Sequence, residues 1–262
     1  MLIATWNVNS VRARMERVLE FLEVHQPDAL LLQETKVAQE QFPFLELAAA
    51  GYQAVDHSTG RWAGVAILVP DDVEVTAPVR GLAGEPLPGE ARWVEATVRG
   101  IRLVSVYVPN GRSLLDPSFP DKLVFLDAMR DRIAALAAAG PLLLGGDLNV
   151  APTDADVWDP RRFVGTTHTS PEERSRLQAM LDAGVVDLHR HVVERGSERE
   201  GDEPGFTWWD YRAGAFHRNL GMRIDLFLAT PDVAARARRC GIDRDFRKGA
   251  KPSDHAPLIV AL

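Results

Sequence analysis

Polar and charged side chains stand at the ends of apolar segments at several separate points along the chain. Taken singly, each could be a turn cap, an Asx turn or a solvated group at a strand exit. An acidic group inside an apolar segment, such as Asp225, is costly to bury without a partner. One shared site explains the whole set better, because ligands of layered α/β proteins gather at strand ends. The candidate residues are Asn7, Glu34, Asp147, Asn149, Asp225, Asp254 and His255.

The ligand types in this set favour a hard metal ion. Carboxylates such as Glu34 and Asp254 are the oxygen ligands that Mg²⁺ accepts, and Mg²⁺ keeps waters and bridges to substrate phosphate. The sequence has a single cysteine and no HExxH motif. A zinc site is therefore not indicated.

The remaining groups suit hydrolysis of a phosphate ester, which needs a nucleophilic water and charge stabilisation on phosphorus. Asp147 could orient or deprotonate the water. Asp225 could hold His255 in one tautomer, as carboxylate–histidine pairs do. Asn149 offers an amide N–H to a phosphoryl oxygen.

Composition places the chain among ordinary globular proteins, with 46% hydrophobic and 26% charged residues. We predict a single domain over residues 1–262, long enough for a sizeable core. The net charge of −7 argues mildly against a nucleic-acid partner, because phosphates are held by Lys and Arg. A metal enzyme can nevertheless concentrate carboxylates at one place and present a basic rim elsewhere.

The chain begins without a basic leader and apolar run, and no stretch approaches 18 uninterrupted apolar residues. We therefore predict neither a secretion signal nor a membrane span. Cys240 stands alone and cannot form an internal disulfide, so we expect a reducing cytoplasm of bacterial type.

Hydrophobic periodicity predicts strands alternating with helices in both halves of the chain. Sheets packed on each other with helices outside fit this layout better than a parallel barrel. We predict strands at 2–8, 29–33, 63–69, 91–98, 101–108, 142–148, 223–229 and 256–261, helices at 11–25, 121–138 and 171–183, and a polar loop at 195–205.

Eight short motifs occur in an order and spacing that resemble the exonuclease III family of AP endonucleases, within the endonuclease/exonuclease/phosphatase superfamily. Each motif alone is weak, whereas the ordered set extends from Thr5 to Leu258. The motifs are WNVNSVRAR (6–14), LQETK (32–36), GVAIL (64–68), YVPNG (107–111), GDLNVAP (146–152), PEER (171–174), RIDLFLA (223–229) and KPSDHAPL (251–258).

The resemblance implies a DNase I-like, four-layered α/β-sandwich of two packed mixed sheets flanked by helices. It also implies a role for each matching residue. Tyr107 matches the active-site tyrosine that contacts the phosphate, Asp147 the aspartate that positions water, Asn149 the asparagine that stabilises the transition state, and His255 with Asp225 the phosphate-facing pair. The matching metal ligands are Asn7, Glu34 and Asp254, with Asp147, Asn149 and His255 as further candidates.

Two features favour the AP endonuclease branch of the superfamily. Tyrosine stands at position 107, where nonspecific nucleases of the pancreatic type carry histidine. Residues 206–225 resemble the segment that receives a flipped abasic sugar, with Trp208, Met222 and Ile224 at the pocket-lining positions. An abasic nucleotide is also cheaper to flip, because it has no base to unstack.

The resemblance further implies DNA contacts at Asn9, Arg12, Asn110 and Arg223. Other arginines that could line a basic face are Arg161, Arg162, Arg212 and Arg218. Four positions depart from the family pattern. Met222 replaces an aromatic residue of some relatives, Ser10 a common glycine and His168 a small residue, and the stretch before Lys122 lacks an aromatic side chain.

The expected activity is hydrolysis of the phosphodiester 5′ to an abasic site in duplex DNA, which leaves a 3′-hydroxyl and a 5′-deoxyribose phosphate. A 3′→5′ exonuclease or 3′-end-processing activity is expected beside it, with Mg²⁺, or Mn²⁺ in its place, as cofactor. We expect a monomer that acts on duplex DNA with abasic sites or blocked 3′ ends. The alternatives are a phosphodiesterase or phosphatase for small molecules or lipids, and a non-catalytic DNA-binding protein.

Overall fold

The computed structural model describes residues 1–194 and 205–262. The loop predicted at 195–205 therefore falls outside the described residues, apart from Gly205. Within the described residues, no helix is both long enough and apolar enough to cross a membrane.

Two six-stranded sheets form the centre of the molecule, and each mixes parallel with antiparallel neighbours. The first sheet runs, in spatial order, β13 (Arg239–Ile242), β14 (Leu258–Ala261), β1 (Leu2–Asn7), β2 (Ala29–Gln33), β4 (Val65–Pro70) and β3 (Tyr52–His57). The second runs β5 (Val75–Arg80), β6 (Trp93–Val98), β7 (Ile101–Tyr107), β8 (Leu142–Asp147), β12 (Asp225–Ala229) and β9 (Val186–Asp187). A short hairpin pairs β10 (Trp208–Trp209) with β11 (Gly221–Met222).

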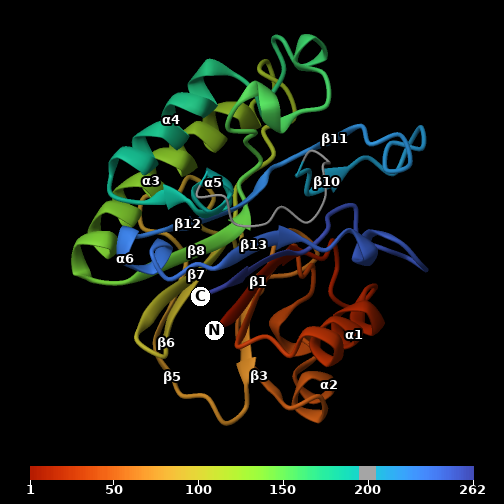
Figure 1. Ribbon diagram of the computed structural model, residues 1–262, viewed down its shortest axis with the longest axis vertical. Coiled ribbons are helices and arrows are strands. Elements are labelled where there is room, and N and C mark those ends of the chain that lie inside the picture. The colour runs from red at the N-terminus through yellow and green to blue at the C-terminus, as the bar shows by residue number, and fades with distance from the viewer. Residues whose placement is uncertain (195–204) are drawn as a thin grey trace.

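Helices cover the outer faces of both sheets (Figure 1). α1 (Met15–His25) and α2 (Phe44–Ala49) lie outside the first sheet, and α3 (Ser118–Ala139) and α4 (Pro171–Asp182) lie outside the second. The short helices α5 (Leu188–Glu194) and α6 (Pro231–Ala234) instead pack against the apolar layer between the two sheets. Short 3₁₀ turns lie at Gln39–Gln41, Asp154–Asp156, Pro160–Arg162 and Arg244–Arg247.

The alternation of side chains along the strands divides the core into layers. Leu31 of β2 and Leu143 of β8 point into the apolar layer between the two sheets. Their neighbour Leu32 packs toward α1 on the outer side of the first sheet. Leu144 packs toward α3 and α4 on the outer side of the second. The result is the predicted four-layered sandwich, with α1 and α2 on one side and α3 and α4 on the other (Figure 1).

The eight predicted strands and three predicted helices are confirmed, with shifts at their ends. The helix predicted to start at residue 11 begins at Met15, because Asn9 and Ser10 adopt left-handed backbone and turn the chain first. The helix predicted at 121 begins earlier, at Ser118, whose N–H and hydroxyl both donate to Asp116. Sequence patterning missed the strands β3, β5, β9, β10, β11 and β13 and the helices α2, α5 and α6. The edge strand β5 was missed because most of its residues are exposed and form no apolar run.

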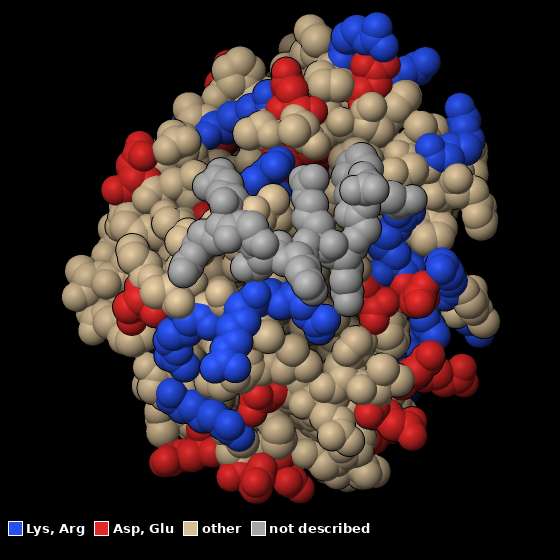
Figure 2. All heavy atoms as spheres, viewed as in Figure 1, with Lys and Arg blue, Asp and Glu red and all other residues tan. Residues whose placement is uncertain are grey.

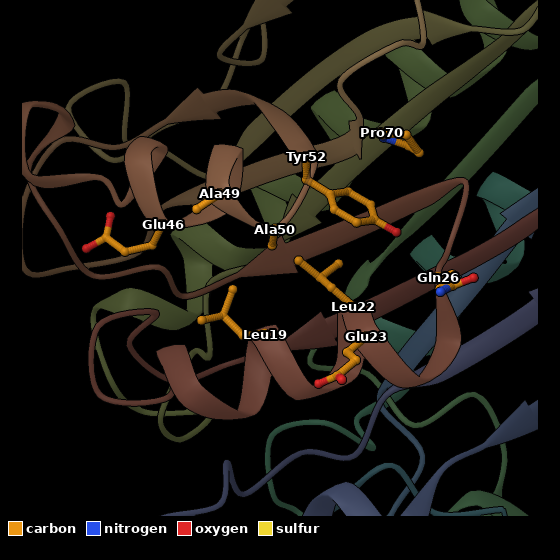
Figure 3. A pocket seen from close by; sticks show the side chains of 9 residues that line it. All are labelled: Leu19, Leu22, Glu23, Gln26, Glu46, Ala49, Ala50, Tyr52 and Pro70. Carbon is orange, nitrogen blue, oxygen red and sulfur yellow. The ribbon is translucent and has the colours of Figure 1, made fainter.

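A surface groove lies between α1 and α2 (Figure 3). Leu19, Leu22 and Tyr52 give it an apolar lining, and Glu23 and Glu46 also line it. The groove reaches Gln26, just before β2, and the last residue of β4, which runs antiparallel to β2. It therefore lies at the end of the first sheet opposite to the one where β2 delivers Glu34.

Candidate active site

Five strands end or begin at one edge of the sandwich and deliver the predicted polar side chains there. Asn7 ends β1, and Glu34 follows its parallel neighbour β2. In the second sheet Tyr107 ends β7 and Asp147 ends β8, and the two residues are paired in register. Asp225, the first residue of β12, is the other cross-strand partner of Asp147. The shared site predicted from the strand ends is therefore formed.

Two carboxylates converge at the centre of this edge. The amide nitrogen of Asn7 donates to Glu34 Oε1 at 2.7 Å and to Asp147 Oδ2 at 2.9 Å, and so joins the two sheets. One ligand atom each from Glu34, Asp147 and His255 lies within 4.8 Å of the others. Such a group is suited to a metal ion, since two acidic side chains held this close repel each other without a cation.

His255 is held between two aspartates. Its Nδ1 lies 2.8 Å from Asp225 Oδ2, and its Nε2 lies 3.7 Å from Asp147 Oδ2. Burial alone would lower the pKa of His255, but the charges of Asp225 and Asp147 outweigh it and raise this pKa to about 10. Burial, reinforced by the nearby carboxylates and opposed by His255, raises the pKa of Asp147 to about 7. The two aspartates therefore favour the protonated form of His255.

Tyr107 stands beside the same carboxylates. Burial and the charges of Glu34 and Asp147 raise the pKa of its phenol well above the usual value. The guanidinium of Arg92 lies 4.7 Å from the ring centroid and donates to the Tyr107 carbonyl oxygen at 3.2 Å. Tyr107 thus remains a hydroxyl donor, and Arg92 is a neighbour that the sequence did not single out.

Asn149 presents its amide from the loop after β8. Its Nδ2 donates to Val108 O at 2.9 Å, while its Oδ1 lies 3.0 Å from His168 Nε2 and 3.2 Å from Asn110 Nδ2. This network fixes which end of the amide is the donor, and it leaves one N–H for a substrate. His168 therefore lies in the site itself, although its sequence signal was only a departure from the family pattern. Burial, with the charge of Lys122 nearby, lowers the pKa of His168 to about 3, so the imidazole is neutral.

Several loop residues of the site adopt left-handed backbone, which is uncommon without glycine. The φ angles are 46° at Asn9, 52° at Glu34 and at Lys36, 51° at Asn149 and 75° at His168. Such strain gathers where surrounding structure holds a functional side chain in place. Lys36, which pairs with Glu34 and donates to Asn9 Oδ1 at 2.7 Å, belongs to this set and was missed as a site residue.

Two of the three predicted metal ligands, Asn7 and Asp254, make hydrogen bonds within the protein, and their role as ligands stays a prediction. Asn7 turns its amide nitrogen to the carboxylates, since its Oδ1 accepts from the Asn9 N–H at 3.0 Å. Asp254 accepts from Asn9 Nδ2 at 3.0 Å and from Trp208 Nε1 at 3.1 Å. Among the described residues, the converging group of candidate ligands does not include Asp254.

The residues predicted to line an abasic pocket lie together beside the site. Met222 and Ile224 are 4% and 2% exposed and pack in one cluster with Ala151 and Val157, against which Trp208 also packs. Their role as the lining of an abasic pocket stays a prediction. In this structure their apolar surfaces face one another, so little of Met222 or Ile224 is open to a sugar.

The predicted DNA contact at Arg223 is wrong. Its side chain is 1% exposed and bonds Asp156 at 2.7 Å and Asp187 at 2.7 Å. A guanidinium paired inside the protein on two sides cannot reach a backbone phosphate. Of the other predicted contacts, Arg12 and Asn110 are exposed and Asn9 is half-buried.

The other predicted arginines are exposed, and some already have acidic partners. Arg161 pairs with Asp159, and Arg212 pairs with Asp210. Figure 2 shows Lys and Arg gathered in a band across the middle of one face, despite the acidic total. The segment entering β13 has exposed arginines at Arg236, Arg238 and Arg239.

The sequence model of the Endonuclease/Exonuclease/phosphatase family matches residues 4–255 of this chain. Exodeoxyribonuclease III of Haemophilus influenzae is 31% identical over 98% of both chains. The chain belongs to the exonuclease III family. Two solved structures of this family cover all of the chain and 99% of their own. The 3′ phosphatase NExo from Neisseria, bound to a product DNA hairpin, is 35% identical with a TM-score of 0.93. The AP endonuclease from Archaeoglobus fulgidus is 33% identical with a TM-score of 0.92.

Membership of the exonuclease III family makes the chain a DNA-repair phosphodiesterase with a metal-binding acidic group and the DNase I-like sandwich predicted from the sequence. It is not a non-catalytic DNA-binding protein. The family includes both 3′-end-processing enzymes and AP endonucleases.

Proposed function

We propose that this exonuclease III-family enzyme uses Mg²⁺ and acts mainly on phosphate esters at DNA 3′ ends, by removing 3′ phosphates and terminal nucleotides. The observation that carries this choice is the place of His168. Its imidazole stands against the amides of Asn149 and Asn110, 3.0 Å and 3.2 Å away, where the family pattern led us to expect a small side chain. A terminal phosphate needs only the phosphate-binding groups, whereas an internal abasic sugar needs additional room beside them.

The donor set fits a divalent cation. The carboxylates of Glu34 and Asp147 both accept hydrogen bonds from the amide nitrogen of Asn7. Glu34 also forms a salt bridge with the Lys36 ammonium. N–H donors therefore already contact both carboxylates. Glu34 and Asp147 would hold Mg²⁺, or Mn²⁺ in its place, and the ion would supply charge stabilisation at the reacting phosphate.

The protonation state of each remaining side chain decides whether it donates or accepts a proton at the reacting phosphate. Protonated His255, fixed by Asp225, can donate from Nε2 to a phosphoryl oxygen. Tyr107 can donate its hydroxyl, and Asn149 its free N–H, to oxygens that gain charge in the transition state. Asp147 is the carboxylate able to orient or deprotonate the attacking water.

Incision 5′ to abasic sites is the second candidate activity. It is supported by the 33% identity to the Archaeoglobus AP endonuclease and by the apolar cluster of Trp208, Met222 and Ile224. To enter this cluster, a flipped abasic sugar would have to separate the three side chains, and it would also meet the imidazole of His168. We therefore place this activity below 3′-end processing.

Substrate competition tests the proposal. A hairpin with a recessed 3′ phosphate, a duplex with one internal abasic analogue and an undamaged duplex are each incubated with Mg²⁺ and with chelator. We expect Mg²⁺-dependent release of phosphate at least tenfold faster than abasic incision. Equal or faster abasic incision would overturn the preference for 3′ ends and favour the second candidate.

The His168→Gly variant separates the two candidates further. Glycine accepts the φ of 75° at this position and removes the imidazole. Abasic incision should rise in this variant relative to phosphate release, because room opens beside Asn149. An unchanged ratio would mean that His168 does not decide the substrate.

A further inference from the structure

A buried ion pair lies behind the site and is not part of the chemistry described above. Lys122 of α3 and Glu173 of α4 form a salt bridge in which both side chains are fully buried. Burying two charges costs free energy that apolar residues of similar size would avoid. The hydrogen bonds that Lys122 and Glu173 make to the site loops show what the buried pair contributes to the structure.

The lysine ammonium bonds the backbone of two site loops. Lys122 Nζ donates to Asn149 O at 2.7 Å and to Asn110 O at 3.1 Å. It also lies 3.3 Å from Thr167 Oγ1. The loop after β7 and the loop after β8 are thus bonded to one cation.

The carboxylate holds the third loop. Glu173 Oε1 accepts from the His168 N–H at 2.9 Å and from Thr167 Oγ1 at 2.8 Å, and Oε2 accepts from the Ser170 N–H at 3.0 Å. The side chains of Asn110 and His168 are the two that meet Asn149 Oδ1. The pair therefore bonds the backbone of all three residues whose side chains meet at this amide.

We propose that Lys122 and Glu173 are positioning residues that set the direction of the Asn149 amide toward the substrate phosphate. They reach the substrate only through Asn149, so they are not catalytic residues themselves. Asn149 holds a left-handed backbone, with φ of 51°, and its carbonyl oxygen is the closest of the backbone acceptors around Lys122. Without the ammonium this carbonyl loses its buried donor, and the loop can relax toward a less strained conformation.

The proposal rests on the role given to Asn149 in the proposed function, and the test separates the two. Lys122→Met, Asn149→Ala and the double variant are assayed on the 3′-phosphate hairpin with Mg²⁺. Affinity for the hairpin is measured in chelator. We expect Lys122→Met to lower kcat about tenfold to a hundredfold, below the loss seen when a transition-state donor is removed outright. Binding should stay within about twofold of wild type, because Asn149 is one of many DNA contacts.

The double variant decides whether Lys122 acts through Asn149. In the Asn149→Ala background, Lys122→Met should lower kcat by less than about threefold, since residues that act as one unit are not additive. If the fold-losses of kcat in the two single variants multiply fully in the double variant, the proposal is overturned. A wild-type kcat in Lys122→Met beside a strong loss in Asn149→Ala would also overturn it. A wild-type kcat in Asn149→Ala would instead refute the role given to that residue.

Arg132→Met is the control for loss of a cation from a buried carboxylate, and in this variant Glu95 keeps Arg102 as a partner. Arg132 bonds Glu95, which is fully buried on β6, and it contacts none of the three site loops. The Arg132→Met variant should be less stable than the wild type, with little change in kcat. If Lys122→Met does not fold, Lys122→Met/Glu173→Gln removes both charges and keeps an oxygen for the His168 N–H. The same loss of kcat is expected for it, and a wild-type kcat in this folded variant would overturn the proposal.

Discussion

At the scale of single residues, the site depends on charges held close together inside the protein. Asp225, Asp147 and Glu34 are near one another, and His255 and Lys36 bring positive charge against them. Each carboxylate therefore shifts the protonation of its neighbours. Substitutions that remove a charge but keep the shape are the most informative tests.

Asp147→Asn keeps the size of the side chain and removes its ability to accept a proton from water. We expect kcat on the 3′-phosphate hairpin to fall by about 10²- to 10⁴-fold, the range typical of a lost general base. Hairpin binding in chelator should be retained within a few fold. Turnover near the wild-type value would exclude water activation by this residue.

Asp56 gives the fold a pH dependence that is separate from catalysis. Burial raises its pKa to about 6, against the hydrogen bond from Ser58 and the charge of Arg80. Because the folded state prefers the protonated form, its contribution to stability is present below about pH 4 and is lost as the pH rises through 6. The free energy of unfolding of the wild type, minus that of Asp56→Asn, should fall by about 1–3 kcal/mol between pH 4 and 7.5. Denaturant titrations at both pH values measure it, and a constant difference would contradict the shift.

At the scale of the elements, β8 delivers Asp147 only because its neighbours approach closely. A Cβ at Gly146 would lie 2.0 Å from the carbonyl oxygen of Val106 on β7, and one at Gly145 would meet Phe227 of β12 at 2.6 Å. Glycine at these two positions lets the strand fit between β7 and β12. The order of strands at the site therefore depends on the absence of side chains as well as on their presence.

Gly146→Ala should lower the free energy of unfolding by about 2–5 kcal/mol, because backbone atoms have to move to admit the methyl group. Gly89→Ala is the control, since a Cβ there meets nothing within 4 Å. It should change stability by less than about 1 kcal/mol. Urea denaturation of both variants makes the comparison, and equal stabilities would show that the β7–β8 pairing can shift at little cost.

At the scale of the whole molecule, the candidate ligands come from both sheets. Glu34 follows β2 of the first sheet, Asp147 ends β8 of the second, and the Asn7 amide spans the two. A cation bound here would connect the two halves of the sandwich. Binding to the folded state alone would stabilise the entire fold.

Mg²⁺ should therefore raise the melting temperature of the wild type, by an amount equivalent to about 2.7 kcal/mol at a hundred times its dissociation constant. Glu34→Ala should lose this response and also need far more Mg²⁺ for turnover. Glu46→Ala, which removes an exposed carboxylate at the α1–α2 groove, is the control and should keep the full response. A Glu34→Ala protein that is stabilised by Mg²⁺ like the wild type would refute the proposed ligand.

The sequence by itself determined the layers and the meeting of the polar groups. Short apolar runs predicted the buried strands, and apolar residues spaced three or four apart predicted the helices. Asn7, Glu34 and Asp147 could therefore be placed at strand ends in advance, and Asp225 within a strand. The edge strand β5 was missed because an exposed strand is held by backbone pairing, which leaves little pattern in the side chains.

Only the tertiary structure decided which charged groups lie in the site and which are paired in the interior. Arg223 stands two residues from Asp225, yet Asp156 and Asp187 from distant segments enclose it. Nothing in the sequence indicated the role of Lys122, which reads as an ordinary lysine in a helix. His168 was noted only because it is larger than the side chain expected at that position. Pairing of this kind depends on contacts between residues far apart in the chain, and local propensity and periodicity carry no information about them.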